Sequence, residues 1–186
     1  MREKYIFLTG FMAAGKSTVG RILAHMLEGQ FIDTDTIIEQ RLCMSIKAIF
    51  AHFGEEYFRS CETVVLQELC CADPNSRLVK GNYTVSSAGS IYRIVATGGG
   101  MVGRMQNREM MRQHGTVVYL HAPWTEISNR LQGGSNRPLA HKVETDRLQR
   151  LWQKRLPLYE DADFIIKTAD LGPRAIAQNI VRCITA

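Results

Sequence analysis

The chain has 186 residues, of which 45% are hydrophobic, and it carries a formal net charge of +5. A chain of this length can bury the core of one compact domain, so we expect a single domain over residues 1–186. No apolar run is long enough to cross a membrane, and the N-terminal residues lack the pattern of a signal peptide. We therefore expect a cytoplasmic protein with no membrane partner.

The excess of positive charge is open to several interpretations. Arginine outnumbers lysine by 16 to 7, and both are dispersed along the chain, which argues against nucleic acid as the partner. An enzyme that binds a nucleotide and a second anion would carry the same excess, because the arginine guanidinium can donate two parallel hydrogen bonds to a phosphate or a carboxylate. Solvated helix surface would carry it too. The five cysteines include no C-x-x-C pair, so we expect buried or idle thiols rather than metal ligands or disulfides.

The most specific motif is GFMAAGKS at Gly10–Ser17, which has the spacing of a phosphate-binding loop. An apolar run at 5–9 predicts a strand before it, and helical spacing over 16–28 predicts a helix after it. A helix that begins at such a turn directs several backbone N–H groups at one point, where they bind an anion. Lys16 would reach the β- and γ-phosphates, and Ser17 would ligate Mg²⁺. A chance match in an ordinary strand–turn–helix is the alternative.

The motif predicts that the chain binds a nucleoside triphosphate. The predicted nucleotide contacts in this loop are Gly10, Ala13, Ala14, Gly15, Lys16, Ser17 and Thr18.

The segment FIDTD at 31–35 predicts a second strand that ends in two carboxylates. The strand predicted at 116–120 has no carboxylate at its end, so an acid that holds the metal has to come from elsewhere. Asp33 and Asp35, at i and i+2, would project from the same side of the second strand. They would lie at the carboxyl end, where open α/β sheets bind ligands. A pair of capping or surface aspartates is the alternative.

The rest of the chain alternates strand-like and helical patterns, which predicts a parallel sheet with helices on both faces. Further strands are predicted at 91–97 and 164–167, and helices at 36–42, 46–53, 55–71 with a break at Gly54, after Pro123, at 144–155 and from Pro173. Residues 133–143 contain two glycines and few apolar residues, which predicts a loop. The stretch 74–90 is either a two-residue hairpin or a disordered insertion.

Several short motifs closely resemble those of shikimate kinases and occur in the same order. They are Asp33-Thr34-Asp35, Gly54-Glu55, Phe58-Arg59, Thr97–Gly100, Arg137-Pro138-Leu139 and Arg155–Tyr159. Each is weak alone, but the ordered set is specific and covers nearly the whole chain apart from 74–90. The resemblance implies a nucleoside-monophosphate-kinase fold, which is a three-layer α/β/α P-loop NTPase with a five-stranded parallel sheet of order 2-3-1-4-5. It also implies a mobile lid at 133–143.

The family's activity is the transfer of the ATP γ-phosphate to the 3-hydroxyl of shikimate, and the resemblance implies shikimate-binding helices at about 36–71. Arg59 and Arg155 look like the family's carboxylate clamp, and Asp35 looks like the ligand of the acceptor hydroxyl. The implied substrate-binding residues are Asp35, Arg59, Gly98, Gly99, Gly100 and Arg155. Taken singly, the arginines could be surface helix residues, and the glycines could form only a tight turn after a strand.

The resemblance extends to the nucleotide and the metal. Asp33 resembles the acid that orients water on Mg²⁺ beside Ser17, and Arg137 resembles a lid arginine that reaches the phosphates. With Lys16 and Asp35, Arg137 completes the implied catalytic set. Arg130 matches an arginine that stacks on adenine, and the segment from 168 to Pro173 resembles the adenine loop.

Two rival functions stay open. A gluconate kinase would share the phosphate loop and an acidic acceptor, although the Asp-Thr-Asp, Phe-Arg and Gly-Gly-Gly motifs together favour shikimate. A non-catalytic homologue would bind nucleotide without turnover, but its usual mark, the loss of Lys16, Asp35 or an arginine, is missing. One departure is Ala13, where the family usually has glycine. We expect a monomeric enzyme whose ligands are ATP, Mg²⁺ and shikimate, with no nucleic-acid partner.

Overall fold

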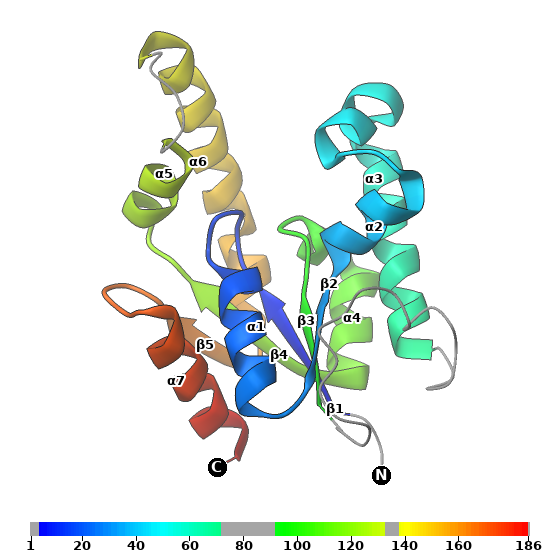
Figure 1. Cartoon of the computed structure of the whole chain (residues 1–186). Coiled ribbons are helices and arrows are strands. Elements are labelled where there is room, and N and C mark those ends of the chain that lie inside the picture. Colours follow the sequence, from blue (N-terminus) through cyan, green and yellow to red (C-terminus); the bar gives the residue numbers. More distant parts are fainter. Residues whose placement is uncertain (1–3, 72–91, 133–137, 186) are drawn as a thin grey trace.

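The computed structural model describes residues 4–71, 92–132 and 138–185 (Figure 1). Of residues 71, 132 and 138–144 it describes the backbone alone. Two predicted features lie outside the described residues, namely the hairpin or insertion at 74–90 and the first part of the lid with Arg137.

Strands and helices alternate through the described residues. The strands are β1 (Lys4–Thr9), β2 (Gln30–Asp33), β3 (Tyr92–Ala96), β4 (Gly115–His121) and β5 (Phe164–Lys167). The helices are α1 (Lys16–Met26), α2 (Thr34–Leu42), α3 (Ile46–Cys71), α4 (Met105–His114), α5 (Trp124–Gln132), α6 (Pro138–Glu160) and α7 (Pro173–Thr185), with a short 3-10 helix η2 (Met101–Gly103). Within these residues, no helix has both the length and the apolarity to cross a membrane.

The five strands form one sheet in the order β2-β3-β1-β4-β5, and every pair is parallel. β1 lies at the centre, where Ile6 is in register with Ile94 on one side and with Thr116 on the other. All carboxyl ends of the strands therefore meet at one edge. The fold class and the strand order predicted from the sequence are confirmed.

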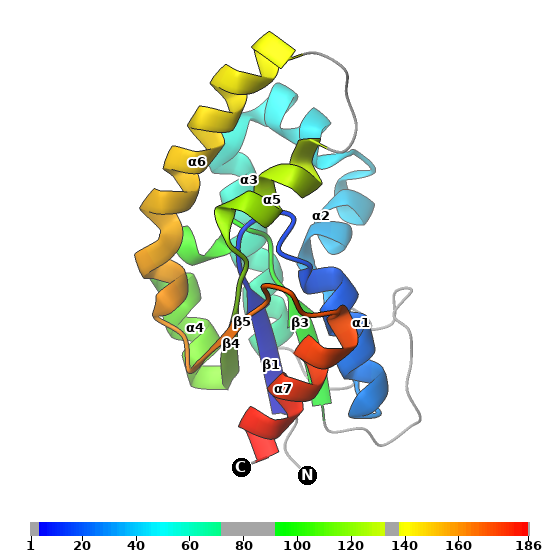
Figure 2. The same ribbon diagram turned by 90° about the vertical axis from the view of Figure 1, so that its left-hand side faces the viewer.

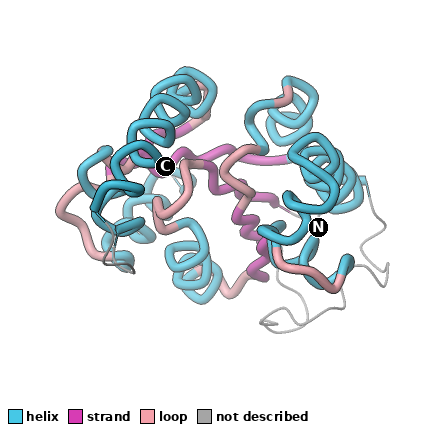
Figure 3. The backbone as a smooth tube through the Cα atoms, turned by 90° about the horizontal axis from the view of Figure 1, so that it is seen from above, coloured by secondary structure: helices cyan, strands magenta, loops and turns pink. Residues whose placement is uncertain are grey.

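Helices cover both faces of the sheet, so the molecule has three layers (Figures 1 and 3). Along β1 the side chains alternate. Ile6 and Leu8 pack with α1 and α7 on one face, while Tyr5 and Phe7 pack with α3, α4 and α6 on the other. Because both faces are buried, the strand has a continuous apolar run at Tyr5–Leu8 rather than alternating apolar and polar residues. Figure 2 shows α7 beside α1, with α4 and α6 on the other side of the sheet.

The second strand ends earlier than predicted. β2 stops at Asp33, and α2 begins at Thr34, so Asp33 and Asp35 do not project from one side of a strand. The Asp33 backbone is extended (φ −120°, ψ 116°), and its side chain accepts hydrogen bonds from the backbone N–H groups of Asp35 and Thr36. Asp33 is thus the N-cap of α2, as the capping alternative required. These capping hydrogen bonds start the helix at Thr34, although the segment has strand propensity.

One other prediction is wrong in part, and one helix is missing from the predicted elements. The predicted loop at 133–143 overlaps α6, whose backbone is helical from Pro138, because proline is well suited to the first position of a helix. The helix α4 was not predicted at all, because its ten residues are mostly polar and only Asn107 and Met111 are buried. By contrast, the break predicted at Gly54 is confirmed, since its φ of 81° interrupts α3.

Candidate active site

The phosphate-binding loop lies between β1 and α1, at the carboxyl edge of the sheet. Gly10 has a φ of 143°, and a side chain there would lie 2.9 Å from the carbonyl oxygen of Leu120. Gly15 has a φ of 91° and is the N-cap of α1. Ala13 also has a positive φ, 62°, in the left-handed region that disfavours a side chain. The loop therefore has the backbone shape of an anion site, with one strained residue in it.

Lys16 reaches back across this loop. Its ammonium donates hydrogen bonds to the carbonyl oxygens of Gly10 at 2.8 Å and Phe11 at 2.9 Å. Burial lowers the pKa of Lys16 to about 8, and the carboxylates of Asp35 and Asp33 oppose this shift. The amine is thus held at the mouth of the loop, where phosphate charge would restore its ordinary preference for the charged form.

The side chains of Ser17 and Asp33 place oxygen atoms that could bind a metal ion beside the loop. The Ser17 hydroxyl donates to Asp33 Oδ2 at 2.7 Å, while Oδ1 of the same carboxylate caps α2. A hydroxyl and a carboxylate next to a phosphate site are the hard oxygen donors that Mg²⁺ prefers. The donor set fits the ion, and both groups are the ones predicted for it. Elsewhere in the described residues, no cluster of three or more His, Cys, Asp or Glu side chains could hold a metal.

Asp35 occupies the next position along the edge of the sheet. Its Oδ1 is buried without a hydrogen-bond partner. Burial and the neighbouring Asp33 raise the pKa of Asp35 to about 6, although Lys16 and Arg59 oppose this. A buried carboxylate oxygen with an open acceptor position is suited to bind a hydroxyl group.

A second buried carboxylate lies close to the first. Glu62 on α3 is fully buried, and its Oε1 also has no partner. A methyl group added at Gly98 would overlap both Glu62 Oε1 and Asp35 Oδ1. Burial raises the pKa of Glu62, Arg59 opposes this rise, and Asp35 adds to it. The two acids therefore face one small space beside the backbone of Gly98.

Arg59 is held from two sides by residues of its own helix. Glu55 Oε1 accepts from Nε at 3.2 Å and Nη2 at 2.8 Å, and Glu62 Oε2 accepts from Nη1 at 2.8 Å. Burial disfavours the charge, but the two glutamates together raise the pKa of Arg59. A guanidinium has five N–H donors. Within the part of the chain that the structure describes, these bonds use three of them, so one N–H on each terminal nitrogen is available for a carboxylate.

Gly98–Gly100, which we name the triglycine turn, touches each part of this cluster. Gly98 adjoins the two acids, and a methyl group at Gly100 would overlap the Arg59 guanidinium. A methyl group at Gly99 would lie 3.2 Å from the backbone nitrogen of Met12 in the phosphate loop. Side chains at these positions would fill the space between the acids, the arginine and the loop. At Gly98 and Gly100 a side chain is thus disfavoured by the close approach of Asp35, Glu62 and Arg59 rather than by φ.

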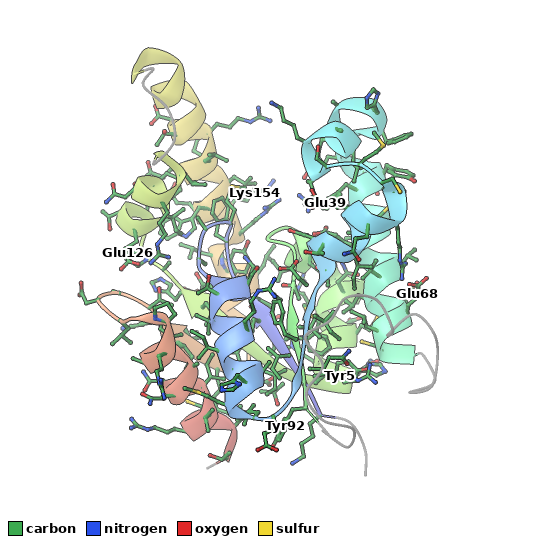
Figure 4. All side chains as sticks on the ribbon, viewed as in Figure 1. Tyr5, Glu39, Glu68, Tyr92, Glu126 and Lys154 are labelled. Carbon is green, nitrogen blue, oxygen red and sulfur yellow. The ribbon has the colours of Figure 1, made fainter. Side chains whose placement is uncertain are left out.

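Arg155 enters from α6 on the opposite side. Its Nη1 lies 3.4 Å from the carbonyl oxygen of Gly99, and its Nη2 lies 3.9 Å from Glu55 Oε1. The structure therefore brings Arg155 and Arg59 to the same carboxylate, that of Glu55, so the two predicted clamp arginines lie close together. Figure 4 shows Glu39 on the α2 side of the site and Lys154 on the α6 side, so two separate parts of the chain flank it.

The residues predicted to contact adenine lie at the same edge of the sheet. Arg130 on α5 donates to the Ala13 carbonyl oxygen at 2.9 Å and to Glu126 at 2.7 Å. Pro173 begins α7, after a segment whose Thr168 donates to the carbonyl oxygen of His121. Arg130 therefore meets the phosphate loop.

The sequence analysis assigned no role in the site to three polar residues. Glu55 and Glu62 flank Arg59 at i−4 and i+3, which are the positions that share a helix face with it. Tyr159 lies four residues after Arg155, and its hydroxyl donates to the Gly99 carbonyl oxygen. Helical spacing from a predicted clamp arginine is the signal that could have found all three.

The chain matches the family model described as shikimate kinase over residues 12–185. A shikimate kinase of Thermodesulfovibrio yellowstonii is 37% identical over 181 residues, which cover 96% of this chain and 94% of that protein. One of Nitrosospira multiformis is 40% identical over 182 residues, covering 97% and 84%.

Solved structures agree. Shikimate kinase from Acinetobacter baumannii in complex with shikimate has a TM-score of 0.80 at 36% identity, covering 98% of this chain and 93% of that one. An APS kinase of Mycobacterium tuberculosis, at 12% identity and a TM-score of 0.59, covers 100% and 99% and shares the fold alone. The family match and the curated relatives together show that the chain belongs to the shikimate kinase family.

Proposed function

We propose that the protein transfers the γ-phosphate of ATP to the 3-hydroxyl of shikimate. The observation that carries this function is the triglycine turn, where two carboxylates and two arginines meet beside a phosphate-binding loop. Shikimate has one carboxylate and three ring hydroxyls. Its site therefore needs guanidinium groups for the carboxylate and hydrogen-bond acceptors for the hydroxyls. The related enzyme of Acinetobacter baumannii is described in complex with shikimate.

Arg59 and Arg155 would bind the shikimate carboxylate. Arg59 offers one N–H on each terminal nitrogen, and Arg155 approaches the same region from α6. A planar guanidinium can hold a carboxylate through two parallel hydrogen bonds. The ring would then lie along the triglycine turn, and its hydroxyls would reach the buried carboxylates of Asp35 and Glu62.

Asp35 would accept a hydrogen bond from the reacting hydroxyl and orient its oxygen toward the γ-phosphate. Phosphoryl transfer passes through a loose transition state, in which positioning and neutralisation of charge matter more than proton removal. Orientation is therefore the main role of Asp35. Lys16 and the loop amides would neutralise the charge on the phosphates, since the ammonium already lies at the loop.

Ser17 and Asp33 would hold Mg²⁺, which the family is expected to use, Ser17 through its hydroxyl and Asp33 through water. When bound, the ion neutralises phosphate charge. Arg130 would stack on the adenine near Pro173. We also propose, from the resemblance alone, that Arg137 reaches the phosphates from a lid at about 133–143 within one 1–186 domain. We further propose a monomeric cytoplasmic enzyme that binds no nucleic acid, and the dispersion of its positive charge supports the last of these points.

An ADP-release assay with ATP and Mg²⁺ tests this function. The acceptor is shikimate, gluconate or none, at matched concentrations. We expect ADP release to depend on shikimate and on Mg²⁺. Turnover with gluconate alone would assign the chain to the gluconate kinases. ATP binding without turnover on either acceptor would mark a non-catalytic homologue. Phosphorus NMR of the product then identifies the hydroxyl that carries the phosphate.

A further inference from the structure

The triglycine turn is held by side chains from α6. The Gly99 carbonyl oxygen accepts a hydrogen bond from the hydroxyl of Tyr159 and another from Arg155 Nη1 at 3.4 Å. These two donors lie one helical turn apart, so one carbonyl group ties the turn to the end of α6. Gly99 also abuts the phosphate loop at Met12.

Tyr159 is fixed in a way that a purely apolar contact would not require. It is only 1% exposed, and its ring stacks on Tyr119 of β4 with centroids 5.2 Å apart at 15°. Burial raises its pKa to about 12, and Arg155, which hydrogen-bonds its hydroxyl, opposes the rise. The hydroxyl therefore stays protonated and donates to Gly99, while it also contacts Arg155.

The region between Arg155 and Tyr159 contains Pro157, inside α6. Proline has no N–H, so the helix loses one of its own hydrogen bonds at this turn. The backbone that carries Arg155 is therefore less constrained by the helix, and contacts of the side chains have to fix it. The bonds to Gly99 are such contacts.

We propose that Tyr159 is a positioning residue for the acceptor, acting through Gly99 and Arg155. Its hydroxyl sets the position of the Arg155 guanidinium relative to the triglycine turn. The guanidinium then contacts the acceptor's carboxylate, while the turn contacts its ring. This inference rests on the proposed function, because it takes Arg155 as a ligand of the acceptor.

The Tyr159→Phe variant removes the hydroxyl and keeps the stacked ring. We expect KM for shikimate to rise about five- to tenfold, as for the loss of one buried hydrogen bond. KM for ATP should change less than twofold, because Lys16 and the loop are held by their own bonds. The matched control is Tyr119→Phe, which removes a hydroxyl from the same stack and should leave both KM values unchanged. Thermal unfolding of both variants monitors the fold.

A double-mutant cycle with Arg155→Lys tests the route of the effect. If Tyr159 acts through Arg155, the double variant will raise KM for shikimate by clearly less than the product of the two single effects. Multiplicative effects, equal changes in both KM values, or a lowered melting temperature with unchanged KM for shikimate would each overturn the proposal. Wild-type protein without shikimate-dependent turnover would instead refute the proposed function, so the two failures are distinguishable.

Discussion

The site has two halves that are built in different ways. The nucleotide half, Gly10–Ser17 with the start of α1, is one continuous segment whose shape depends on local backbone geometry. The acceptor half combines residues from α2, α3, the triglycine turn and α6, and the contacts that join these elements, such as those of Arg155 and Tyr159 with Gly99, link residues far apart in the chain. A contiguous motif can specify the first half, whereas tertiary packing has to assemble the second.

The difference also shows in the charges. In the nucleotide half the half-buried Lys16 has a pKa lowered to about 8, and its ammonium lies at the loop where phosphate would bind. In the acceptor half, buried acids with open oxygen positions lie beside an arginine that two glutamates orient. The first half is a site for a strong anion. The second presents acceptors and cationic donors to a small molecule that carries both hydroxyls and a carboxylate.

The largest effect is expected in the nucleotide half. Lys16→Met removes the ammonium that neutralises phosphate charge, so we expect kcat to fall by about a thousandfold or more. The ADP-release assay measures this directly. The matched control is Lys167→Met, which removes a charge from β5. If Lys16→Met retained more than a tenth of wild-type kcat, the role given to this lysine would be wrong.

Arg59→Lys sharpens the comparison from the acceptor side. Lysine keeps the charge but cannot offer two parallel N–H groups, so transition-state stabilisation should drop by about 2–3 kcal/mol. The loss should appear in KM for shikimate and hardly in KM for ATP. Arg41→Lys is the control, because Arg41 pairs with Glu68 instead. An unchanged KM for shikimate in folded Arg59→Lys would return this arginine to a structural role.

Asp35→Asn tests whether the ionised carboxylate in the acceptor half lowers the free energy of unfolding. The pKa of Asp35 is raised to about 6 in the folded protein, from an ordinary value of 3.8. The folded form therefore holds the proton more tightly, and its stability falls as pH rises from about 4 to about 6. Asparagine does not titrate. In ligand-free protein with a chelator, we expect Asp35→Asn to gain about 2 kcal/mol relative to wild type between these pH values.

Urea unfolding at pH 4 and at pH 7 measures that gain, and a difference that stays constant across this range would contradict it. The same variant should have a strongly reduced kcat, because Asp35 orients the reacting hydroxyl.

The smallest effect concerns Ala13. Its φ of 62° is unfavourable for a residue with a side chain, so Ala13→Gly should relieve strain. The greater freedom of glycine in the unfolded chain opposes this, and a net gain of about 0.5 kcal/mol remains. Ala14→Gly, at a buried neighbour without positive φ, should instead lose stability. Urea unfolding of both variants checks the pair, and destabilisation by Ala13→Gly would show that this φ is not strained.

The sequence could predict the strands, most of the helices and the nucleotide half because these depend on local patterns, whereas the order of the strands in the sheet came from the family resemblance. Apolar runs marked every strand, and the Gly-x-x-x-x-Gly-Lys-Ser spacing marked the loop. Thr34 and Asp35 were assigned to the second strand because a strand end and a helix N-cap look alike in sequence, and only the hydrogen bonds from Asp35 and Thr36 to the Asp33 carboxylate distinguish them. Polar α4 carried too little apolar periodicity to be recognised.

The acceptor half was predictable only where a family motif named its residues. Glu62 lies outside these motifs, and Tyr159 stands in one of them without an assigned role. The importance of both comes from contacts across the fold, with Asp35 beside Gly98 in one case and with Gly99 in the other. Helical spacing places Glu62 on the same helix face as Arg59, but it does not show that the Glu62 side chain is fully buried.

Titration calorimetry of shikimate into Lys16→Met and Arg59→Lys tests the division into two halves most directly. Neither experiment requires turnover. We expect Lys16→Met to bind shikimate within about threefold of wild type, and Arg59→Lys to bind it about thirtyfold or more weakly. If Lys16→Met lost shikimate binding while Arg59→Lys kept it, the account of the site would be contradicted.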